Sequence, residues 1–272
     1  MTVSPTSPLV LIGAGNMGGA MLSGWLKSGL EGGSVLVIDP GVSPHMAELC
    51  AAHGVRVEKA APEGLKAGIL FLAVKPQMME TVLPPLKGLV GSDTVIVSVA
   101  AGKTLAFLET HLGKAGMVRA MPNTPAMVGR GITGAFATPD ITDAQRAEVH
   151  DLLKVSGPVE WVGTEGEIDA VTAVSGSGPA YVFYLVECMA EAGRKAGLQA
   201  DLAMRLARET VSGAGEMLYQ SPETASKLRE NVTSPGGTTF AALQVLMAEE
   251  GMQPLFDAAI AAAKARAQEL AD

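Results

Sequence analysis

The sequence predicts an α/β fold with an N-terminal doubly wound sheet, followed by a C-terminal all-helical domain. Short β-branched apolar runs alternate with amphipathic segments as far as Val162, and this alternation stops after Gly163. Beyond that point the chain is rich in Ala and has apolar residues at three- and four-residue spacing. Alternating strands and helices are typical of parallel sheets covered on both faces. Because 272 residues exceed one core of about 100–200 residues, we expect two domains, residues 1–163 and 164–272.

The expected strands are largely apolar, as strands buried on both faces of a sheet should be. They are Leu9–Ile12, Val35–Asp39, Ile69–Val74, Thr94–Val99, Met117–Ala120, Gly134–Ala137 and Val159–Val162. The helices expected between them are Asn16–Ser28, Pro44–His53, Pro76–Lys87 and Thr142–Val155. The carboxyl ends of such strands meet at one edge of the sheet, where ligands bind.

In the second half the spacing predicts helices only, over Ile168–Val174, Pro179–Lys195, Leu202–Tyr219, Thr239–Ala248 and Leu255–Leu270. The stretch Ala180–Ala192 carries few charges, so some of these helices are expected to be hydrophobic all round and buried. We expect this domain to bury against a second copy of itself.

Composition argues against several classes of protein. A net charge of −8 and a pI near 5.1 disfavour a nucleic-acid-binding surface, which needs a basic face. Cys50 and Cys188 lie 138 residues apart and form no CxxC pair, so neither a disulfide framework nor a metal site is expected. Glycines interrupt the uncharged run Leu9–Leu26, and no Lys or Arg precedes it. We therefore expect no membrane insertion and a cytoplasmic location.

A glycine-rich turn follows the first expected strand and opens the first helix. It consists of Gly13, Ala14, Gly15, Asn16, Met17 and Gly18. In dinucleotide-binding turns the first Gly makes the bend, the second admits the pyrophosphate and the third lets helix and strand pack closely. The helix N-terminus then offers unpaired N–H groups to the phosphates. The alternative is a glycine turn without a ligand, but its strand–turn–helix context favours a Rossmann-type site.

Asp39 ends the second strand, where a carboxylate can accept both ribose hydroxyls of NAD and repel the 2′-phosphate of NADP. No Arg or Lys follows it through Met46, which favours NADH, although Arg56 or Lys59 can still supply a cation. The alternative is that Asp39 simply starts the turn that continues through Pro40 and Gly41.

Three later strand ends carry further candidates for the cofactor site. Lys75 is placed to face a phosphate or ribose, Ala100 with Ala101 to let the nicotinamide ring approach, and Asn123 to hold its carboxamide. Each turn alone is also explained as an ordinary strand-to-helix connection, with Pro76 at the first position of a helix. Three of them on one edge favour a cofactor crevice.

The helical half contains a second candidate site, the segment Ser234–Thr239 just before an apolar helix. Hydroxyls and unpaired N–H groups converge there, an arrangement suited to a carboxylate. A Ser or Thr N-cap after a turn explains the pattern equally well. A second break, Ser175–Tyr181, either faces a substrate or lets helices cross closely, and Pro179 can start a new helix there.

Six motifs in order resemble those of pyrroline-5-carboxylate reductases, over nearly the whole chain. They are Gly13–Gly18, Ala73–Gln77, Ser98–Gly102, Met121–Pro125, Asp169–Thr172 with Ser175–Tyr181, and Ser234–Thr239. The resemblance implies a Rossmann domain, a helical domain that forms an interlocked homodimer, and reduction of 1-pyrroline-5-carboxylate to L-proline with NADPH or NADH. Assembly of dimers into a larger ring is a further expectation.

Carried over position by position, the resemblance assigns the substrate carboxylate to Ser234, Gly237, Thr238 and Thr239. Ser234 and Thr239 are also the expected catalytic residues. The cofactor residues that it implies are Gly13, Gly15, Asn16, Met17, Gly18, Asp39, Lys75, Ala100 and Asn123. One departure matters: many relatives carry a Ser- or Arg-containing loop after the second strand, whereas this chain has Asp39, Pro40 and Gly41. That departure leaves the choice between the two cofactors open.

Hydride transfer to a protonated cyclic imine requires mainly that two reactants be held in contact. This fits the position of the four histidines outside every motif, and Tyr181 is the one nearby hydroxyl considered as a proton relay. A 3-hydroxyacid dehydrogenase is a rival, but Pro179–Arg194 contains no Lys to act on an alcohol oxygen. A non-catalytic nucleotide sensor is the other rival, and it needs no carboxylate pocket.

Overall fold

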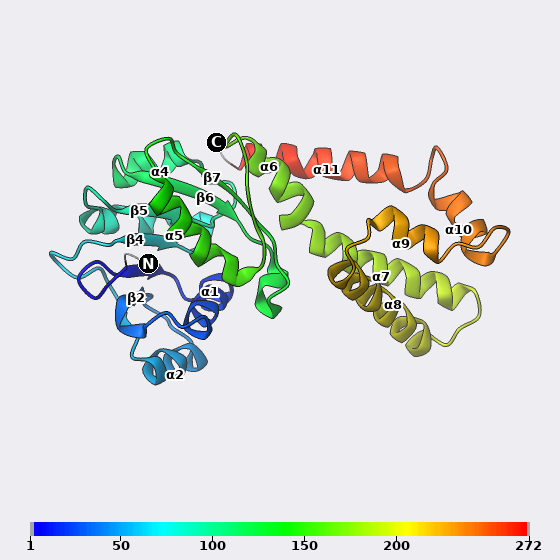
Figure 1. The fold of residues 1–272 in the computed structure, drawn as a ribbon, viewed down its shortest axis with the longest axis horizontal. Coiled ribbons are helices and arrows are strands. Elements are labelled where there is room, and N and C mark those ends of the chain that lie inside the picture. The colour runs from blue at the N-terminus through cyan, green and yellow to red at the C-terminus, as the bar shows by residue number, and fades with distance from the viewer. Residues whose placement is uncertain (1–2, 271–272) are drawn as a thin grey trace. The chain divides into compact units, whose positions relative to one another are not determined.

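The computed structural model describes residues 3–270, and within them eight strands form one sheet in the order β3-β2-β1-β4-β5-β6-β7-β8 (Figure 1). The strands are β1 Leu9–Ile12, β2 Val35–Ile38, β3 Arg56–Glu58, β4 Ile69–Leu72, β5 Val95–Ser98, β6 Gly116–Met121, β7 Thr133–Ala137 and β8 Val159–Trp161. The predicted doubly wound sheet is thereby confirmed. Because β1 lies between β2 and β4, the strand order reverses there, and open α/β sheets bind ligands at such a point.

Helices cover both faces of the sheet. One face packs against α1 (Asn16–Lys27), α2 (Pro44–His53) and α5 (Asp143–Leu153), and the other against α3 (Met79–Val82) and α4 (Leu105–Leu112). On the first face the fully buried Trp25 donates from Nε1 to the carbonyl of Leu152 at 2.8 Å and meets the Phe71 ring edge-on. A buried indole N–H needs such a partner, so this bond fixes α1 against α5.

The starts of the helices follow from the residues at their ends. Ser43 caps α2, because its hydroxyl accepts from the N–H of Met46, and Pro44 occupies the first turn. Thr142 and Gln145 form a reciprocal capping box at α5. The expectation that Pro179 starts a new helix is confirmed, since α7 begins at Gly178.

The first 163 residues differ from the sequence prediction in three details. The strand β3 was not expected, because it is an edge strand of three residues with no buried side chain. The helix expected over Pro76–Lys87 is broken into short turns around α3, since Pro84 and Pro85 cannot continue it. The strand β7 runs antiparallel to β6, because only a short loop with one 3-10 turn, Thr124–Val128, joins them.

By packing, the chain divides into two compact units. One extends to Gly176 and includes the C-terminal end from Ala263, and the other is Ser177–Ala262. We call the first the sheet unit and the second the helical unit. The division predicted after residue 163 lies one helix earlier, at the end of the last strand. The helix α6 (Glu167–Val171) comes after residue 163 but still packs on the sheet unit, through the buried Ile168. A π-helical turn, Thr172–Gly176, then leads to α7.

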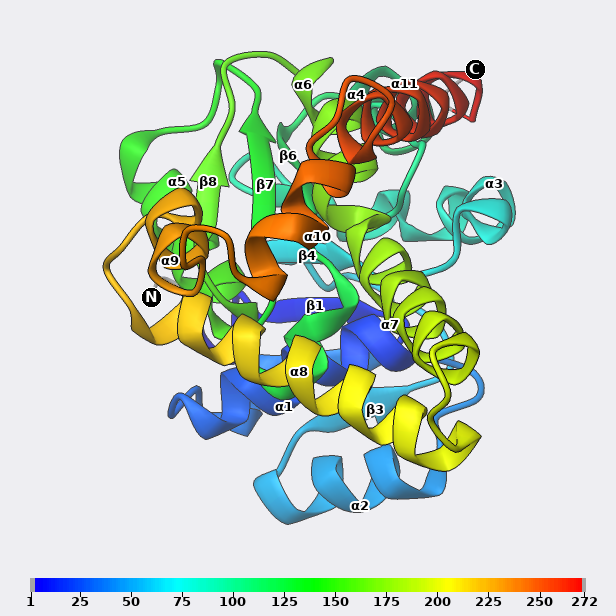
Figure 2. The same ribbon diagram turned by 90° about the vertical axis from the view of Figure 1, so that its right-hand side faces the viewer.

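The second half is helical, as predicted. After α6 come α7 Gly178–Lys195, α8 Ala200–Gln220, α9 Ala225–Asn231, α10 Thr238–Leu246 and α11 Met252–Glu269. Figure 2 shows α7 and α8 as antiparallel neighbours, and they pack closely. The short helix α9 was not expected, because it is mostly polar and buries no residue, so it has no apolar periodicity.

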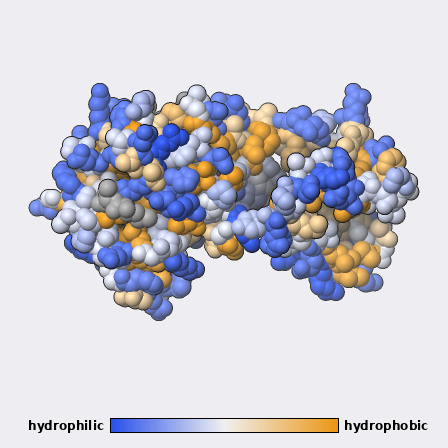
Figure 3. Space-filling view, viewed as in Figure 1, coloured by the Kyte–Doolittle hydropathy of each residue, from blue (hydrophilic) through white to orange (hydrophobic). Residues whose placement is uncertain are grey.

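Large apolar side chains are exposed on the helical unit. Phe183 and Tyr184 on α7 are 65% and 66% exposed, and Leu255 at the start of α11 is 70% exposed. Within α7 only Ala190 is buried. Orange apolar surface is visible over the helical part in Figure 3. A single chain thus leaves uncovered the faces that the sequence predicts to be buried.

Candidate active site

The turn between β1 and α1 has the geometry that its glycines predict. Gly13 has φ of +86°, and a Cβ on Gly18 would lie 2.0 Å from the carbonyl oxygen of Gly13. Both positions therefore exclude any larger residue. A Cβ on Gly15 would meet nothing within 4 Å, so this side of the backbone is open. Gly15 caps α1 without a side-chain bond, which leaves N–H groups of the first turn for a ligand.

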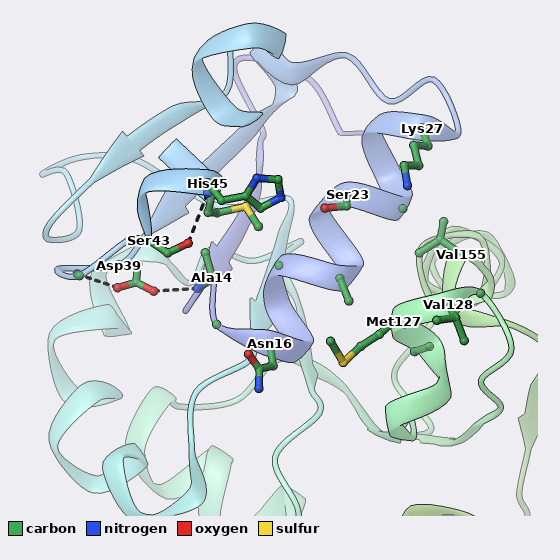
Figure 4. Close-up of a pocket in the computed structure, with 18 residues that line it drawn as sticks. Ala14, Asn16, Ser23, Lys27, Asp39, Ser43, His45, Met127, Val128 and Val155 are labelled. Atoms are coloured by element: carbon green, nitrogen blue, oxygen red, sulfur yellow. Dashed lines mark hydrogen bonds between the residues drawn. The ribbon is translucent and has the colours of Figure 1, made fainter. Parts of the chain in front are cut away.

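Asp39 is bound to the glycine-rich turn and to its own loop. Its Oδ2 accepts from the N–H of Ala14 at 2.8 Å, and its Oδ1 accepts from the N–H of Gly41 at 2.8 Å (Figure 4). The second bond makes the local turn that was the simpler alternative for this residue. Contact of Asp39 with a ribose remains a prediction.

Two cavities open beside this turn, and both are lined by Gly15 and Asp39. One, of about 440 Å³, has mostly apolar walls that include Ile38, Val74 and Leu86, with Lys75 also on its lining. The other, of about 720 Å³, follows α1 past Asn16. An apolar cleft beside unpaired N–H groups at a helix start suits a flat base joined to phosphates.

The larger cavity contains residues that the sequence analysis did not single out. Figure 4 shows Ser43, His45, Lys27 and Met127 around it. The sequence analysis assigned no role to Ser43 and placed His45 outside the motifs. Their position in the sequence, at the start of the helix that follows Asp39, was the one feature that could have indicated that they lie near the dinucleotide turn.

The strand-end candidates lie in different settings. Lys75 immediately precedes a 3-10 turn started by Pro76 and lines the apolar cavity. Ala100 follows β5, is buried, and its N–H donates to the hydroxyl of Ser98. Asn123 follows β6, and its amide holds protein groups: Nδ2 donates to the carbonyl of Ser175, and Oδ1 accepts from the N–H of Ile132. Asn123 thus ties the loop after β6 to the π-helical turn, and its role towards nicotinamide is untested.

A buried ion-pair network at this edge was missed. Arg119 on β6 is 3% exposed and pairs with Asp169 at 2.9 Å and with Glu165 at 3.3 Å. Glu165 also accepts from the N–H of Leu105 at the start of α4. The signal was the single charge in the apolar run from Met117 to Ala120. This network joins β6, the start of α4 and α6, and so holds these three elements against one another.

The second candidate site is a turn at the start of α10. The N–H of Gly237 donates to the carbonyl of Ser234 at 3.0 Å, and Gly236 has φ of +71°. Gly237 is the N-cap and makes no side-chain cap bond, so the expected alternative of a Ser or Thr cap is not what forms here. Ser234 and Thr238 are exposed and Thr239 is half-buried. These three residues lie at the start of α10, where the first N–H groups of the helix have no side-chain cap, an arrangement compatible with a carboxylate site.

Among residues 3–270, no cluster of three or more His, Cys, Asp or Glu side chains is arranged to hold a metal ion. Within the same range, no helix combines the length and the apolar character needed to span a bilayer.

Comparison with known proteins places both halves of the chain. Residues 165–270 match a family model described as pyrroline-5-carboxylate reductase dimerisation, and residues 8–102 match one described as NADP oxidoreductase, coenzyme F420-dependent. The chain is 39% identical over 269 residues to a pyrroline-5-carboxylate reductase of Pseudomonas aeruginosa, covering 98% of both chains.

Solved structures agree with these matches. A pyrroline-5-carboxylate reductase from Coxiella burnetii has a TM-score of 0.89 at 35% identity, covering 98% of this chain and 99% of the other. A pyrroline carboxylate reductase from Plasmodium falciparum, solved with NADP bound, has a TM-score of 0.79 at 26% identity with the same coverage.

Proposed function

Because the chain belongs to the pyrroline-5-carboxylate reductase family, we propose that it reduces 1-pyrroline-5-carboxylate to L-proline with NADPH or NADH, the last step of proline biosynthesis. The observation that carries this proposal is the 39% identity to a reductase of that name along 98% of both chains. The glycine-rich turn and the carboxylate-type turn support it, because the reaction needs one site for each reactant.

The sheet unit fits the cofactor. The open backbone at Gly15 and the uncapped first turn of α1, with Asn16 and Met17, would hold the diphosphate. The apolar cavity beside Lys75 would take the adenine and its ribose. Ala100, a small buried residue after β5, is the residue assigned to the nicotinamide end. The bound NAD(P)H supplies the hydride. All of these residue roles are part of the proposal.

The substrate carboxylate is assigned to the turn at the start of α10. The hydroxyls of Ser234, Thr238 and Thr239 and the N–H groups of the first turn, which begins after the uncapped Gly237, would donate to it. Ser234 and Thr239 act by holding the imine ring in position, since a protonated imine needs no strong acid or base to accept hydride. Tyr181 is the candidate proton relay that would supply the proton on the imine nitrogen before hydride transfer.

We further propose that the enzyme works as a homodimer through residues 164–272, that dimers assemble into a larger ring, and that it acts in the cytoplasm. The exposed apolar faces of α7 and α11 support the dimer, because a soluble chain rarely leaves such side chains uncovered.

A steady-state assay tests the function directly. The purified protein is mixed with 1-pyrroline-5-carboxylate and either NADPH or NADH, and oxidation of the cofactor and formation of proline are followed together. We expect turnover with at least one cofactor and none when the imine is left out. Absence of turnover with both would overturn the enzyme assignment and favour the sensor alternative. Oxidation of a 3-hydroxyacid with NAD⁺ or NADP⁺ instead would favour the dehydrogenase.

A further inference from the structure

The carboxylate of Asp39 joins two backbone segments that a dinucleotide site depends on. It accepts from the N–H of Ala14, inside the glycine-rich turn, and from the N–H of Gly41, in the loop after β2, each at 2.8 Å. Figure 4 shows the carboxylate of Asp39 directed towards Ala14, and Asp39 lines the larger cavity. Both bonds are charge-assisted and have good length, so they are among the stronger local bonds of the turn.

The bond to Ala14 solves a specific problem of the turn. Ala14 is 6% exposed and precedes α1, so its N–H has no partner within that helix. A buried N–H without a partner destabilises the fold by about as much as a lost hydrogen bond. The N–H of Gly13 is already bound to the carbonyl of Ile38 at 3.0 Å. Together these two bonds hold the bend of the turn against the end of β2.

We infer that Asp39 is a positioning residue: by holding the N–H of Ala14 it fixes the glycine-rich turn, and so sets the affinity for both cofactors in parallel instead of selecting NADH over NADPH. This inference rests on the proposed use of NAD(P)H. It differs from the usual interpretation of an acidic residue at the end of the second strand, in which the carboxylate selects against a 2′-phosphate.

The two roles predict opposite results when the charge is removed. A residue that selects against the 2′-phosphate leaves NADP binding stronger relative to NAD when its charge is lost. A residue that fixes the turn weakens both, because both cofactors share the diphosphate that the turn binds. The ratio of the two affinities therefore separates the roles.

Asp39→Asn is the variant that separates them most clearly. Its amide has one acceptor oxygen for the two N–H groups, so whichever of Ala14 and Gly41 it holds, its NH₂ group faces the N–H of the other and two donors oppose each other. Asp39→Ser is the second variant: its hydroxyl can make the local turn with Gly41 but is too short to replace the reach to Ala14. Asp140→Asn, on an exposed Asp of the same unit, is the matched control for the loss of one charge.

Binding of NAD⁺ and NADP⁺ to each variant is measured by calorimetry, without turnover, so failure of imine reduction would leave this test intact. We expect both affinities to fall by about 10-fold or more in the Asp39 variants, with their ratio changed by less than about 3-fold, and no change in Asp140→Asn. A rise of about 10-fold or more in the NADP⁺ to NAD⁺ affinity ratio would overturn the inference, and so would unchanged binding of both.

The unaltered protein provides a measure that no folding defect can obscure. Amide hydrogen exchange at Ala14 should be strongly slowed in the ligand-free protein, because the carboxylate holds this N–H. In Asp39→Ser, where that variant folds, exchange at Ala14 should rise while exchange in the core strand β4 stays slow. Exchange at the unprotected rate in the unaltered protein would overturn the inference.

Discussion

At the scale of single residues, the glycines of the first turn have separable functions. A Cβ on Gly18 would strike the carbonyl of Gly13, whereas a Cβ on Gly15 would enter open space, and Gly15 has an ordinary φ of −72°. We therefore expect Gly15→Ala to fold with its free energy of unfolding changed by less than about 1 kcal/mol, yet to weaken NAD⁺ and NADP⁺ together, since the methyl group occupies the side that the diphosphate approaches. Denaturant unfolding and calorimetry measure the two effects.

Gly33→Ala is the matched control, because a Cβ there also meets nothing within 4 Å and the residue lies outside the cavities. It should change neither stability nor cofactor binding appreciably. Normal cofactor affinity in Gly15→Ala would show that the diphosphate does not approach this face of the turn.

Thr239 tests the proposed substrate site in the same way. Replacing it with Val keeps the shape and removes one hydroxyl, and a hydrogen bond to a charged group is worth about 1.5–3 kcal/mol. We expect KM for the imine to rise by about 10-fold or more, with the Kd for the cofactor unchanged. Thr110→Val, on the exposed side of α4, is the control. Equal loss of cofactor binding would mean that Thr239 serves a different site.

The sequence could predict these residues only where a chemical rule applies to one local segment. The Gly13–Gly18 turn and the start of α10 follow such rules: the backbone geometry of the first is as its glycines predict, and the second starts a helix that no side chain caps, while the binding roles of both stay predictions. His45 and Ser43 were not singled out as site residues, because their presence on the larger cavity depends on how α2 lies beside α1. The bonds of Asn123 to Ser175 and Ile132 were likewise invisible, since they join segments far apart in the chain.

At the scale of elements, the buried ion pair holds the carboxyl edge of the sheet together. Arg119 and Asp169 are both nearly buried, so removing Asp169 leaves the buried Arg119 with only its longer pair to the partly exposed Glu165. We expect Asp169→Leu to lower the free energy of unfolding by about 3–5 kcal/mol. The double variant with Arg119→Met should be less destabilised than Asp169→Leu alone, because both charges are then gone. Urea unfolding of the sheet unit measures this, and a double variant less stable than the single one would contradict the argument.

Strands and helices were predictable from the sequence in proportion to how many apolar side chains they bury. Strands such as β1, β2, β4 and β5 are buried throughout or nearly so, and their apolar runs marked them in the sequence. The strand β3 and the helix α9 are short and mostly exposed, so no periodic apolar pattern revealed them. The breaks around α3 required recognising that two prolines stop a helix that apolar spacing alone would continue.

At the scale of the whole molecule, the helical unit is expected to be complete only in a homodimer. Phe183 on α7 and Leu255 on α11 are 65% and 70% exposed in the single chain, and burying a large apolar side chain stabilises by about 1.5–3 kcal/mol. We predict that the protein is at least dimeric in solution, and that Phe183→Glu and Leu255→Glu each shift it towards monomer. Analytical ultracentrifugation across a range of protein concentrations measures the shift.

Activity and cofactor binding should then separate in these two variants. The glycine-rich turn and both cavities belong to the sheet unit, so NADP⁺ binding should persist in the monomer. Imine reduction should fall with the fraction of dimer, because the proposed carboxylate site lies in the helical unit, which matches the dimerisation family model. Val57→Glu, at a 38% exposed position on the edge strand β3, is the control and should leave both the assembly and the activity unchanged. A fully active monomer would show that the helical unit needs no second copy to bind the imine.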